Sequence, residues 1–263
     1  MLELYHNGMS TCSQKVRLCL AEKQLDWTDR YMDLRAGDQH TPDYLALNPK
    51  GVVPTLVDDG TVIVESTVIN EYLDDRFPEP RLRSKDPLDV ARMRIWTKQL
   101  DEGLHAETGV MSNAIAFRFQ KLAKGKDFAN KLVEGIPDVA KRERYRSVVF
   151  EGVQSPLFKA SIKRFRRLLD DMDAALAGHR WLAGETFSLA DIGFAPYITR
   201  MDHLGLAKMW LEQPRIADWY KRITSRPSYE PAYIRWFDDK YLDLMEEKGR
   251  EYWPEIDACL REA

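Results

Sequence analysis

A short polar segment near the start of the chain carries both a hydroxyl and a thiol. Ser10 and Cys12 lie within residues 9–13, between a strand-like stretch and a helical pattern. The N-terminus of a helix stabilises an anion and lowers the pKa of a nearby cysteine. Ser10 can cap the helix or donate a hydrogen bond to a thiolate, and Cys12 can be a core residue or a nucleophile. The segment predicts thiol chemistry, with Ser10 and Cys12 as the candidate catalytic residues.

The spacing of Cys12 bears on which of the two residues acts. Cys12 recurs at helical intervals with Val16, Cys19 and Leu20, which form an apolar face. We therefore expect Cys12 to point toward the core. Ser10 precedes the helix, where its hydroxyl can reach outward, so the spacing favours Ser10 as the donor to a thiolate.

A proline interrupts the strand pattern of residues 52–57. Proline has no N–H to give to a ladder, so it is usually confined to edge strands and bulges. A cis peptide bond before Pro54 would instead turn the strand end and expose the backbone N–H and C=O of Val53. Such a strand end can pair with a peptide-like ligand. Both interpretations of Pro54 remain open from the sequence.

Glu65 and Ser66 follow at the start of the next helical pattern. Ser66 can be a plain N-cap, since serine is favoured there. A helix N-terminus also binds a carboxylate through its unpaired N–H groups. An acid beside it can meet an ammonium group, so the pair suits an α-amino-acid group as ligand.

Alternating strand and helix signals position these residues. Strand patterns cover residues 2–6, 27–34, 52–57 and 62–64, and helical patterns start at Cys12, Thr41 and Ser66. The order is βαβ, then α, then ββα. We predict an α/β domain over residues 1–80.

Strand signals end after residue 80. Pro78-Glu79-Pro80 and the polar stretch up to Pro87 predict a linker. A helical pattern runs from Leu88 to about residue 124, residues 125–154 are less regular, and further helices start at Pro156, after Ser188 and at Pro214. We predict an all-α domain over residues 88–263.

Composition excludes several classes of function. The net charge is -3 across 263 residues, which favours neither nucleic acid nor a membrane surface as partner. No apolar run approaches the roughly 20 residues that span a bilayer. The start of the chain lacks the pattern of a signal peptide, and the three cysteines form no CxxC pair. The histidines show no metal-ligand spacing. We expect a cytoplasmic protein that binds no metal.

The motifs together resemble the glutathione S-transferase superfamily. The resemblance rests on residues 10–18, Leu47-Asn48-Pro49, Val53-Pro54-Thr55-Leu56, residues 65–73 and Ser188-Leu-Ala-Asp191, and it extends from residue 2 to about 230. The Ser-x-Cys-Ser stretch is similar to the zeta class and to tetrachlorohydroquinone reductive dehalogenases. Residues 65–79 look closer to bacterial β-aryl-etherases. The resemblance implies a thioredoxin-like domain that binds glutathione, followed by an all-α domain that binds the second substrate.

The resemblance also implies residue roles toward glutathione. Val53, beside Pro54, would bind the cysteinyl backbone, and Glu65 and Ser66 would bind the γ-glutamyl group. Ser10 would stabilise the thiolate.

Other positions follow from the same resemblance. In the dehalogenases, the residue at Cys12 resolves a mixed disulfide with glutathione. Gln39, His40 and Lys50 are candidates for the glycyl carboxylate. This chain departs from the pattern at Val52, where zeta and etherase members often have Gln, and so lacks one possible polar contact.

The function implied is transfer chemistry on glutathione. The thiolate would attack an electrophilic aromatic or aryl-ether substrate, in aromatic-compound degradation or detoxification, and the resemblance implies a homodimer. Reductive dehalogenation or thiol transfer through Cys12 is one alternative. Isomerisation of a maleylacetoacetate-type diacid is another, although it would require basic residues near Ser10 and the sequence offers only Arg17 there. A non-catalytic binding module is a third, which the joint presence of Ser10, Val53-Pro54 and Glu65-Ser66 disfavours.

Overall fold

The computed structural model describes residues 1–136 and 138–262; Pro137 and Ala263, which belong to the predicted helical domain, lie outside this part. Two compact units make up the chain. The first comprises Met1–Lys98, Gly178–Pro196 and Asp218–Asp238, and the second comprises Gln99–Ala177, Tyr197–Ala217 and Asp239–Ala263. These units are discontinuous in sequence, and the contiguous domains 1–80 and 88–263 remain a prediction.

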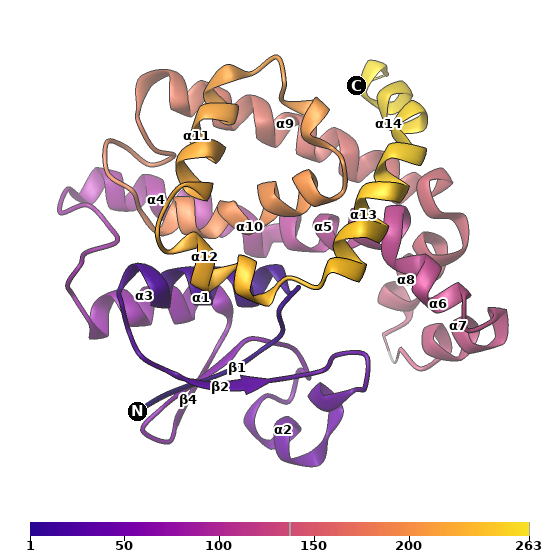
Figure 1. The fold of residues 1–263 in the computed structure, drawn as a ribbon, viewed down its shortest axis with the longest axis horizontal. Helices are drawn as coiled ribbons and strands as arrows, with labels where there is room; N and C mark the ends of the chain where they lie inside the picture. The colour runs from indigo at the N-terminus through magenta and orange to yellow at the C-terminus, as the bar shows by residue number, and fades with distance from the viewer. Residues whose placement is uncertain (137, 263) are drawn as a thin grey trace. The chain divides into compact units, whose positions relative to one another are not determined.

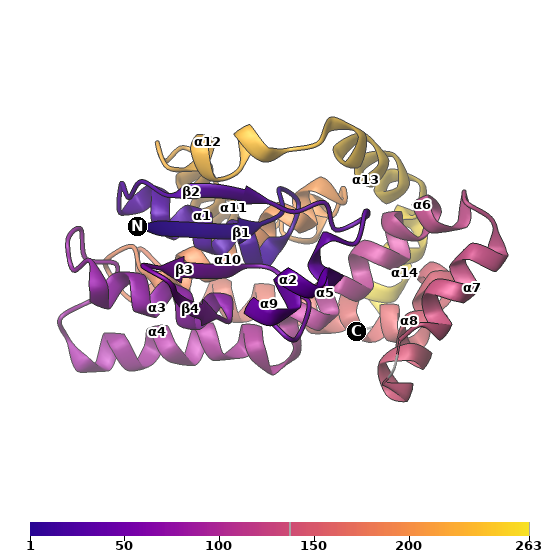
Figure 2. The same ribbon diagram turned by 90° about the horizontal axis from the view of Figure 1, so that it is seen from below.

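A four-stranded sheet forms the centre of the first unit (Figure 2). Its strands, in the spatial order β2-β1-β3-β4, are β1 (Leu2–His6), β2 (Thr28–Tyr31), β3 (Thr55–Asp58) and β4 (Thr61–Val64). Strand β1 runs parallel to β2 and antiparallel to β3, and β3 pairs with β4 as a hairpin. The predicted mixed strand and helix order is confirmed. The strand expected from residue 52 begins only at Thr55, after the proline that cannot donate to the ladder.

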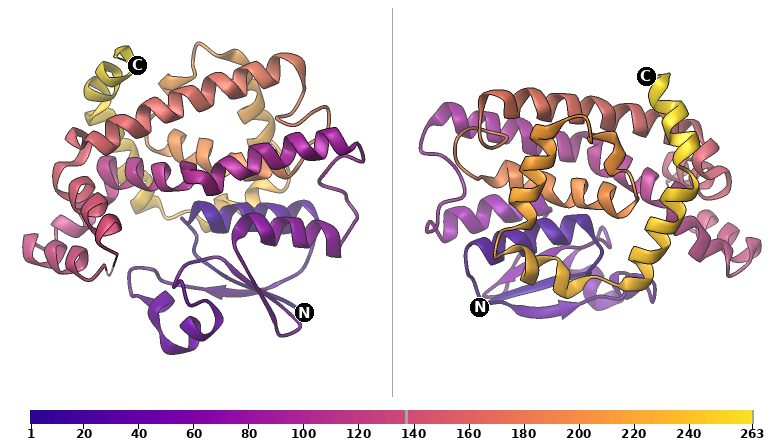
Figure 3. Two further views of the ribbon diagram at one scale, coloured as in Figure 1. Left: turned by 180° about the vertical axis from the view of Figure 1, so that it is seen from behind. Right: turned by 45° about the horizontal axis from the view of Figure 1, so that its top comes forward.

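Helices cover both faces of this sheet. Helices α1 (Thr11–Glu22) and α3 (Ser66–Arg76) lie on one face, and α2 (Pro42–Leu47) lies on the other (Figures 1 and 3). The short helix η1 (Asp38–His40) and α2 precede β3 along the chain. The core between α1, α3 and the sheet consists of fully buried aliphatic side chains: Leu4, Val16, Leu20, Leu56, Ile69 and Leu73. The unit also holds α4 (Pro87–Gln99), α12 (Tyr229–Ala232) and η6 (Ile234–Trp236), and α12 contacts α1.

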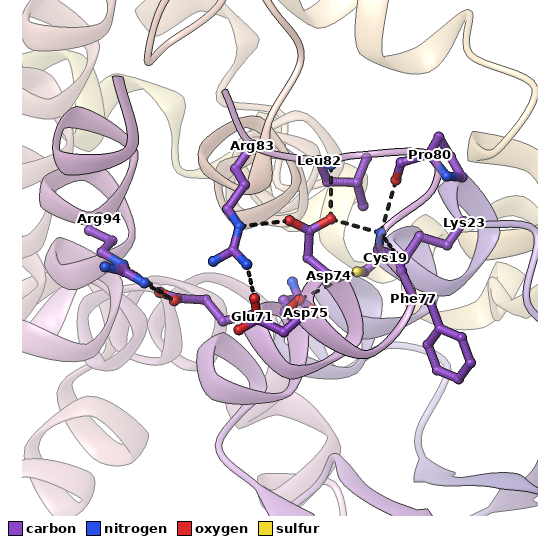
Figure 4. Close-up of polar contacts among 11 residues, drawn as sticks. Cys19, Lys23, Glu71, Asp74, Asp75, Phe77, Pro80, Leu82, Arg83 and Arg94 are labelled. Carbon is purple, nitrogen blue, oxygen red and sulfur yellow. Dashed lines mark hydrogen bonds and ion pairs between the residues drawn. The ribbon is translucent and has the colours of Figure 1, made fainter. Parts of the chain in front are cut away.

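A buried ion pair fixes the chain that leaves α3 (Figure 4). Lys23 donates to Asp74 Oδ1 at 2.7 Å and to the carbonyl oxygens of Phe77 and Pro80 at 2.7 and 2.9 Å. Arg83 Nε is 3.1 Å from the second oxygen of Asp74. Removal of one partner from such a buried pair costs about 3–5 kcal/mol. The stretch that the sequence predicts as a linker is therefore tied to α1 and α3.

The second unit is helical. Its elements are η2 (Leu100–Leu104), α5 (His105–Ser112), η3 (Asn113–Phe117), α6 (Arg118–Leu122), α7 (Lys126–Glu134), α8 (Val139–Glu151), η4 (Gly152–Gln154), α9 (Pro156–Gly178), η5 (Ala207–Met209), α13 (Asp239–Glu251) and α14 (Trp253–Arg261). Helices α10 (Leu189–His203) and α11 (Pro214–Thr224) have residues in both units. No helix within the described ranges is long and apolar enough to cross a membrane.

The helical pattern expected from Leu88 to about residue 124 is confirmed, with a break at Glu102 and Gly103, whose dihedral angles are non-helical within a π-helical turn. The expectation for residues 125–154 was wrong, because this less regular stretch is largely helical as α7 and α8. Helix α8 buries only Val148 and Val149, so it has no continuous apolar stripe to predict it.

Candidate active site

Strand register brings four loops to one end of the sheet. Tyr5 of β1 pairs with Thr55 of β3, and Thr55 pairs with Val64 of β4. The residues that follow β1 and β4 and those that precede β3 therefore meet at the same end. Strand β2 is parallel to β1, so the segment after it reaches this end too. Every residue that the sequence predicts for the site lies in these loops or in the first turns of α1 and α3.

Ser10 is the N-cap of α1. Its Oγ accepts a hydrogen bond from the backbone N–H of Ser13 at 3.2 Å, which satisfies one of the unpaired donors of the first turn. A hydroxyl that accepts through a lone pair still has its own proton to donate. Ser10 can therefore cap the helix and donate to a thiolate at once, so the two interpretations of this residue are compatible.

Cys12 occupies the first turn of the same helix. Val16, Cys19 and Leu20 are fully buried, whereas Cys12 is only half-buried. The expectation that Cys12 shares the core position of these three residues was wrong in degree, because the first turn lies at the end of the sheet rather than over its middle. Burial raises the pKa of the Cys19 thiol far above its usual range. Cys19 is therefore inert, and the more exposed Cys12 is the thiol of α1 that can react.

The Val53–Pro54 peptide bond is cis, as the second interpretation of Pro54 predicted. Tyr44 Oη donates to the Val52 carbonyl oxygen at 2.6 Å, and Asn48 Nδ2 donates to the same oxygen at 2.9 Å. These two side chains hold the loop that precedes β3. Among residues 1–136 and 138–262, no hydrogen bond is made to the N–H or the C=O of Val53. Both groups are thus available to pair with an extended ligand.

Glu65 and Ser66 open α3 in an arrangement that differs from the expected one. Glu65, not Ser66, is the N-cap, and Ser66 is the first helical residue. Glu65 has φ 70°, a backbone conformation that non-glycine residues rarely adopt. Strain of this kind clusters at ligand sites. The Ser66 hydroxyl therefore lies at the helix start, beside the Glu65 carboxylate. Within the described part of the chain, this hydroxyl has no hydrogen-bond partner.

The three candidates for a glycyl carboxylate occupy two neighbouring loops. Lys50 Nζ is 2.6 Å from Glu65 Oε1. His40 lies against Gly51, where a Cβ would come within 2.9 Å of His40 Nδ1. Gln39 donates to the Leu34 carbonyl oxygen at 3.3 Å, and its buried Oε1 has no partner among the described residues. The structure therefore brings Lys50 directly to Glu65 and places His40 beside the same loop.

Arg17 is not available to a diacid substrate. Its side chain is buried, and it donates to the backbone carbonyl oxygens of Asn7, Gly8 and Ala232. These bonds turn Arg17 away from solvent, so the one basic residue that the sequence offered near Ser10 does not support the isomerase alternative.

Sequence reasoning missed the residues that support the site. Tyr44 and Asn48 hold the loop of Val53 in place through hydrogen bonds. In the sequence, only the Asn48-Pro49 pair pointed to this loop.

The part of the chain that is described holds no group of three or more His, Cys, Asp or Glu that could bind a metal ion. The site thus offers a hydroxyl and a thiol for chemistry, a strand end for a peptide backbone, and a helix start with an acid for an α-amino-acid group.

Two family models match the chain. One, described as glutathione S-transferase, N-terminal domain, matches residues 9–76. The other, described as glutathione S-transferase, C-terminal domain, matches residues 142–222. Together they cover more than half of the chain, and the first contains every candidate site residue.

Individual proteins match over nearly the whole length. Protein LigF of Sphingobium sp. is 29% identical over 259 residues, which cover 95% of this chain and 98% of LigF. The tetrachloro-p-hydroquinone reductive dehalogenase of Sphingobium chlorophenolicum is 27% identical over 242 residues, covering 89% and 96% of the two chains. The crystal structure of the beta-etherase LigF superimposes with a TM-score of 0.78 at 26% identity, covering 89% of this chain and 99% of that one.

Proposed function

Since this chain belongs to the glutathione S-transferase family, we propose that it is a transferase that activates glutathione as a thiolate at Ser10 and directs it at an electrophilic aromatic or aryl-ether carbon. Glutathione is the co-substrate. The sulfur forms the new bond to carbon, the leaving group departs with the bonding electron pair, and a thioether results.

The glutathione site is proposed mainly from one observation. The unpaired backbone of Val53 and the start of α3 lie at the same end of one hairpin. Val53 precedes Thr55 by two residues and Ser66 follows Val64 by two, and Thr55 and Val64 are direct partners. A γ-glutamyl-cysteinyl backbone in extended form presents an N–H and a C=O to Val53 and an amino-acid group to Glu65 and Ser66. The N-terminus of α3 and the Ser66 hydroxyl would take its carboxylate, and Glu65 its ammonium.

Ser10 is proposed as the thiolate donor because its hydroxyl lies at the same end of the sheet and retains a proton to give. A preorganised donor aimed at an anion stabilises it without reorganisation. The helix dipole of α1 acts in the same direction.

The second substrate is proposed from the relatives. The name beta-etherase belongs to LigF, and we extend aryl-ether cleavage to this chain as the first activity to test. Incubation with glutathione and a panel of aryl ethers, halogenated hydroquinones and maleylacetone, followed by mass spectrometry, identifies the product. A glutathione thioether of an aryl-ether substrate supports the proposal. Turnover of maleylacetone alone, or of no compound, counts against it.

Reductive dehalogenation through Cys12 is the second candidate. It is favoured by the partial exposure of Cys12 and by the match to a reductive dehalogenase. In that reaction Cys12 would resolve a glutathione conjugate, forming a Cys12–glutathione disulfide that a further glutathione reduces. Formation of a reduced product together with glutathione disulfide would identify it.

We propose a homodimer in the cytoplasm, where the three cysteines would remain as thiols rather than disulfides. Helices α3 and α4, joined by the Arg94–Glu71 ion pair, carry apolar side chains that are more than half exposed: Val68, Leu88 and Ile95. This face is the proposed location of the dimer contact.

A further inference from the structure

A buried arginine holds the loop that carries Ser10. Arg17 Nη1 donates to the Asn7 carbonyl oxygen at 2.9 Å, and Nη2 donates to the Gly8 carbonyl oxygen at 2.8 Å. Nε donates to the Ala232 carbonyl oxygen at 2.8 Å, 215 positions away along the chain. The planar guanidinium offers five donors in a fixed fork, so it can fix several carbonyl groups in one arrangement.

These bonds orient the dipoles of the loop. In a trans peptide the C=O and N–H point in opposite directions. The Asn7 carbonyl oxygen, which accepts from Arg17 Nη1, also accepts from the backbone N–H of Ser10 at 3.3 Å. The Met9 N–H, in the peptide whose oxygen is bonded to Arg17 Nη2, donates to Asn7 Oδ1 at 3.0 Å. Arg17 therefore fixes the peptide groups of residues 7–10, and with them the position at which Ser10 presents its hydroxyl to an anion.

Arg17 stays positively charged near neutral pH despite its burial. His6 Nδ1 accepts from Arg17 Nη1 at 3.0 Å, so the His6 proton is on Nε2, which donates to Asp29 Oδ1 at 2.8 Å. Burial and the charge of Arg17 lower the pKa of His6 to about 4, which keeps this ring neutral. Burial lowers the pKa of Arg17 to about 9, still above neutrality, and Asp29, Tyr31 and Tyr233 also face it.

The segment that precedes α13 contacts the same loop. Trp236 lies with its ring 5.5 Å from the Arg17 guanidinium carbon and 4.6 Å from the His6 ring. Its carbonyl oxygen approaches Gly8 so closely that a Cβ there would be only 2.4 Å away. Gly8 does not have a positive φ, so its lack of a side chain is required by this contact alone.

We propose that Arg17 is a positioning residue for the reaction, and that residues 232–236 act through it and through Gly8 to hold the Ser10 loop in its thiolate-stabilising form. This inference rests on the proposed role of Ser10 and extends the active-site machinery to a segment that contributes no group to it. Neither Arg17 nor Trp236 touches the substrate in this account.

Three substitutions test the role on the full-length protein. Arg17→Met removes all the hydrogen bonds to carbonyl groups. Arg17→Lys keeps the positive charge but lacks the planar guanidinium group. Gly8→Ala displaces the loop from Trp236 without removing a hydrogen bond. Arg17→Met and Gly8→Ala should lower kcat by about 10²-fold, the effect of misplacing a reacting group by about 1 Å. The KM for glutathione should change little, and the pKa of bound glutathione, followed by thiolate absorbance, should rise. Arg17→Lys should recover part of kcat.

Arg226→Met is the matched control. Arg226 also ties α1 to the chain after α11, with its Nη2 2.6 Å from Glu22 Oε2, but it does not contact residues 7–10. It should lower the melting temperature while kcat and the thiol pKa stay at wild-type values. If Arg17→Met does not fold, Gly8→Ala and Arg17→Lys decide the matter by the same measurements.

Ser10→Ala is measured alongside to distinguish failure of the proposed Ser10 role from failure of the proposed Arg17 role. Loss of thiolate in Ser10→Ala, with wild-type kcat and thiol pKa in folded Arg17→Met and Gly8→Ala, overturns the positioning role alone. Wild-type thiolate in every variant, Ser10→Ala included, contradicts the proposed function and this inference with it.

Discussion

The Lys50 ammonium and the Glu65 carboxylate lie 2.6 Å apart at the N-terminus of α3, both largely exposed to solvent. An exposed ion pair contributes little to stability, because solvent screens the two charges. The ammonium of a γ-glutamyl group can therefore replace Lys50 at Glu65 at small cost. In the proposed glutathione complex, Lys50 would then meet the glycyl carboxylate of the same ligand, and Glu65 its ammonium group.

Ser66→Ala should weaken the affinity for glutathione by about 1–3 kcal/mol, because a hydrogen bond to a charged carboxylate is lost. Isothermal titration calorimetry measures this directly. Thr61→Ala, on the exposed edge of β4, is the control and should bind as the wild type does. An unchanged affinity for Ser66→Ala would remove Ser66 from the site.

Cys12→Ser should retain most of the transferase activity, because Ser10 and not Cys12 is the proposed donor. Turnover of an aryl-ether substrate and intact mass of the enzyme after turnover check this. Abolished turnover, together with a Cys12–glutathione adduct in the native enzyme, would place the protein with the reductive dehalogenases.

Local patterns sufficed for much of the fold. The alternation of apolar residues predicted β1 at its observed bounds, and Pro156 and Pro214 marked the starts of α9 and α11. Helix α8 escaped prediction because its sequence is rich in basic residues and it is largely exposed. Its packing depends on other helices of its unit, which periodicity does not report.

The sequence indicated candidate site residues but not their geometry. Motif spacing indicated Ser10, Val53 and Ser66, and their roles remain a prediction. That Ser66 follows the N-cap, rather than being it, depends on the positive φ of Glu65, which no pattern signals. The burial of Arg17 depends on Ala232, far along the chain, so a cation in α1 could not be recognised as an interior residue from local sequence.

Acid should destabilise the first unit through His6. The folded-state pKa of His6 is lowered from 6.5 to about 4 by burial and by Arg17, so the unfolded chain binds the proton more tightly. The contribution to stability is complete above pH 6.5 and is lost as the pH falls toward 4, up to about 3 kcal/mol.

Urea unfolding between pH 7 and pH 4.5 measures this dependence. His6→Gln should show a shallower loss of unfolding free energy than the wild type, and His179→Gln, at a partly exposed histidine beside Glu185, should match the wild type. Equal slopes in all three proteins would show that His6 does not titrate in this range.

The chain should form a dimer of twice its 30.6 kDa mass at micromolar concentration. Multi-angle light scattering gives this mass. Ile95→Glu, which places a charge on the exposed face of α3 and α4, should shift the protein toward the single-chain mass, whereas Leu211→Glu, at another exposed apolar residue, should not. A wild-type mass near 30.6 kDa would rule out the homodimer.

The ionisation of bound glutathione tests the central claim most directly. Titration of thiolate absorbance should show glutathione ionised near neutral pH on the wild type and on Ser10→Thr, which keeps a hydroxyl. Ser10→Ala should raise the thiol pKa and cut turnover by about 10²–10³-fold, with a loss of about 1 kcal/mol in stability from the missing cap. A Ser10→Ala protein that binds glutathione as a thiolate and turns over at the wild-type rate would contradict the account.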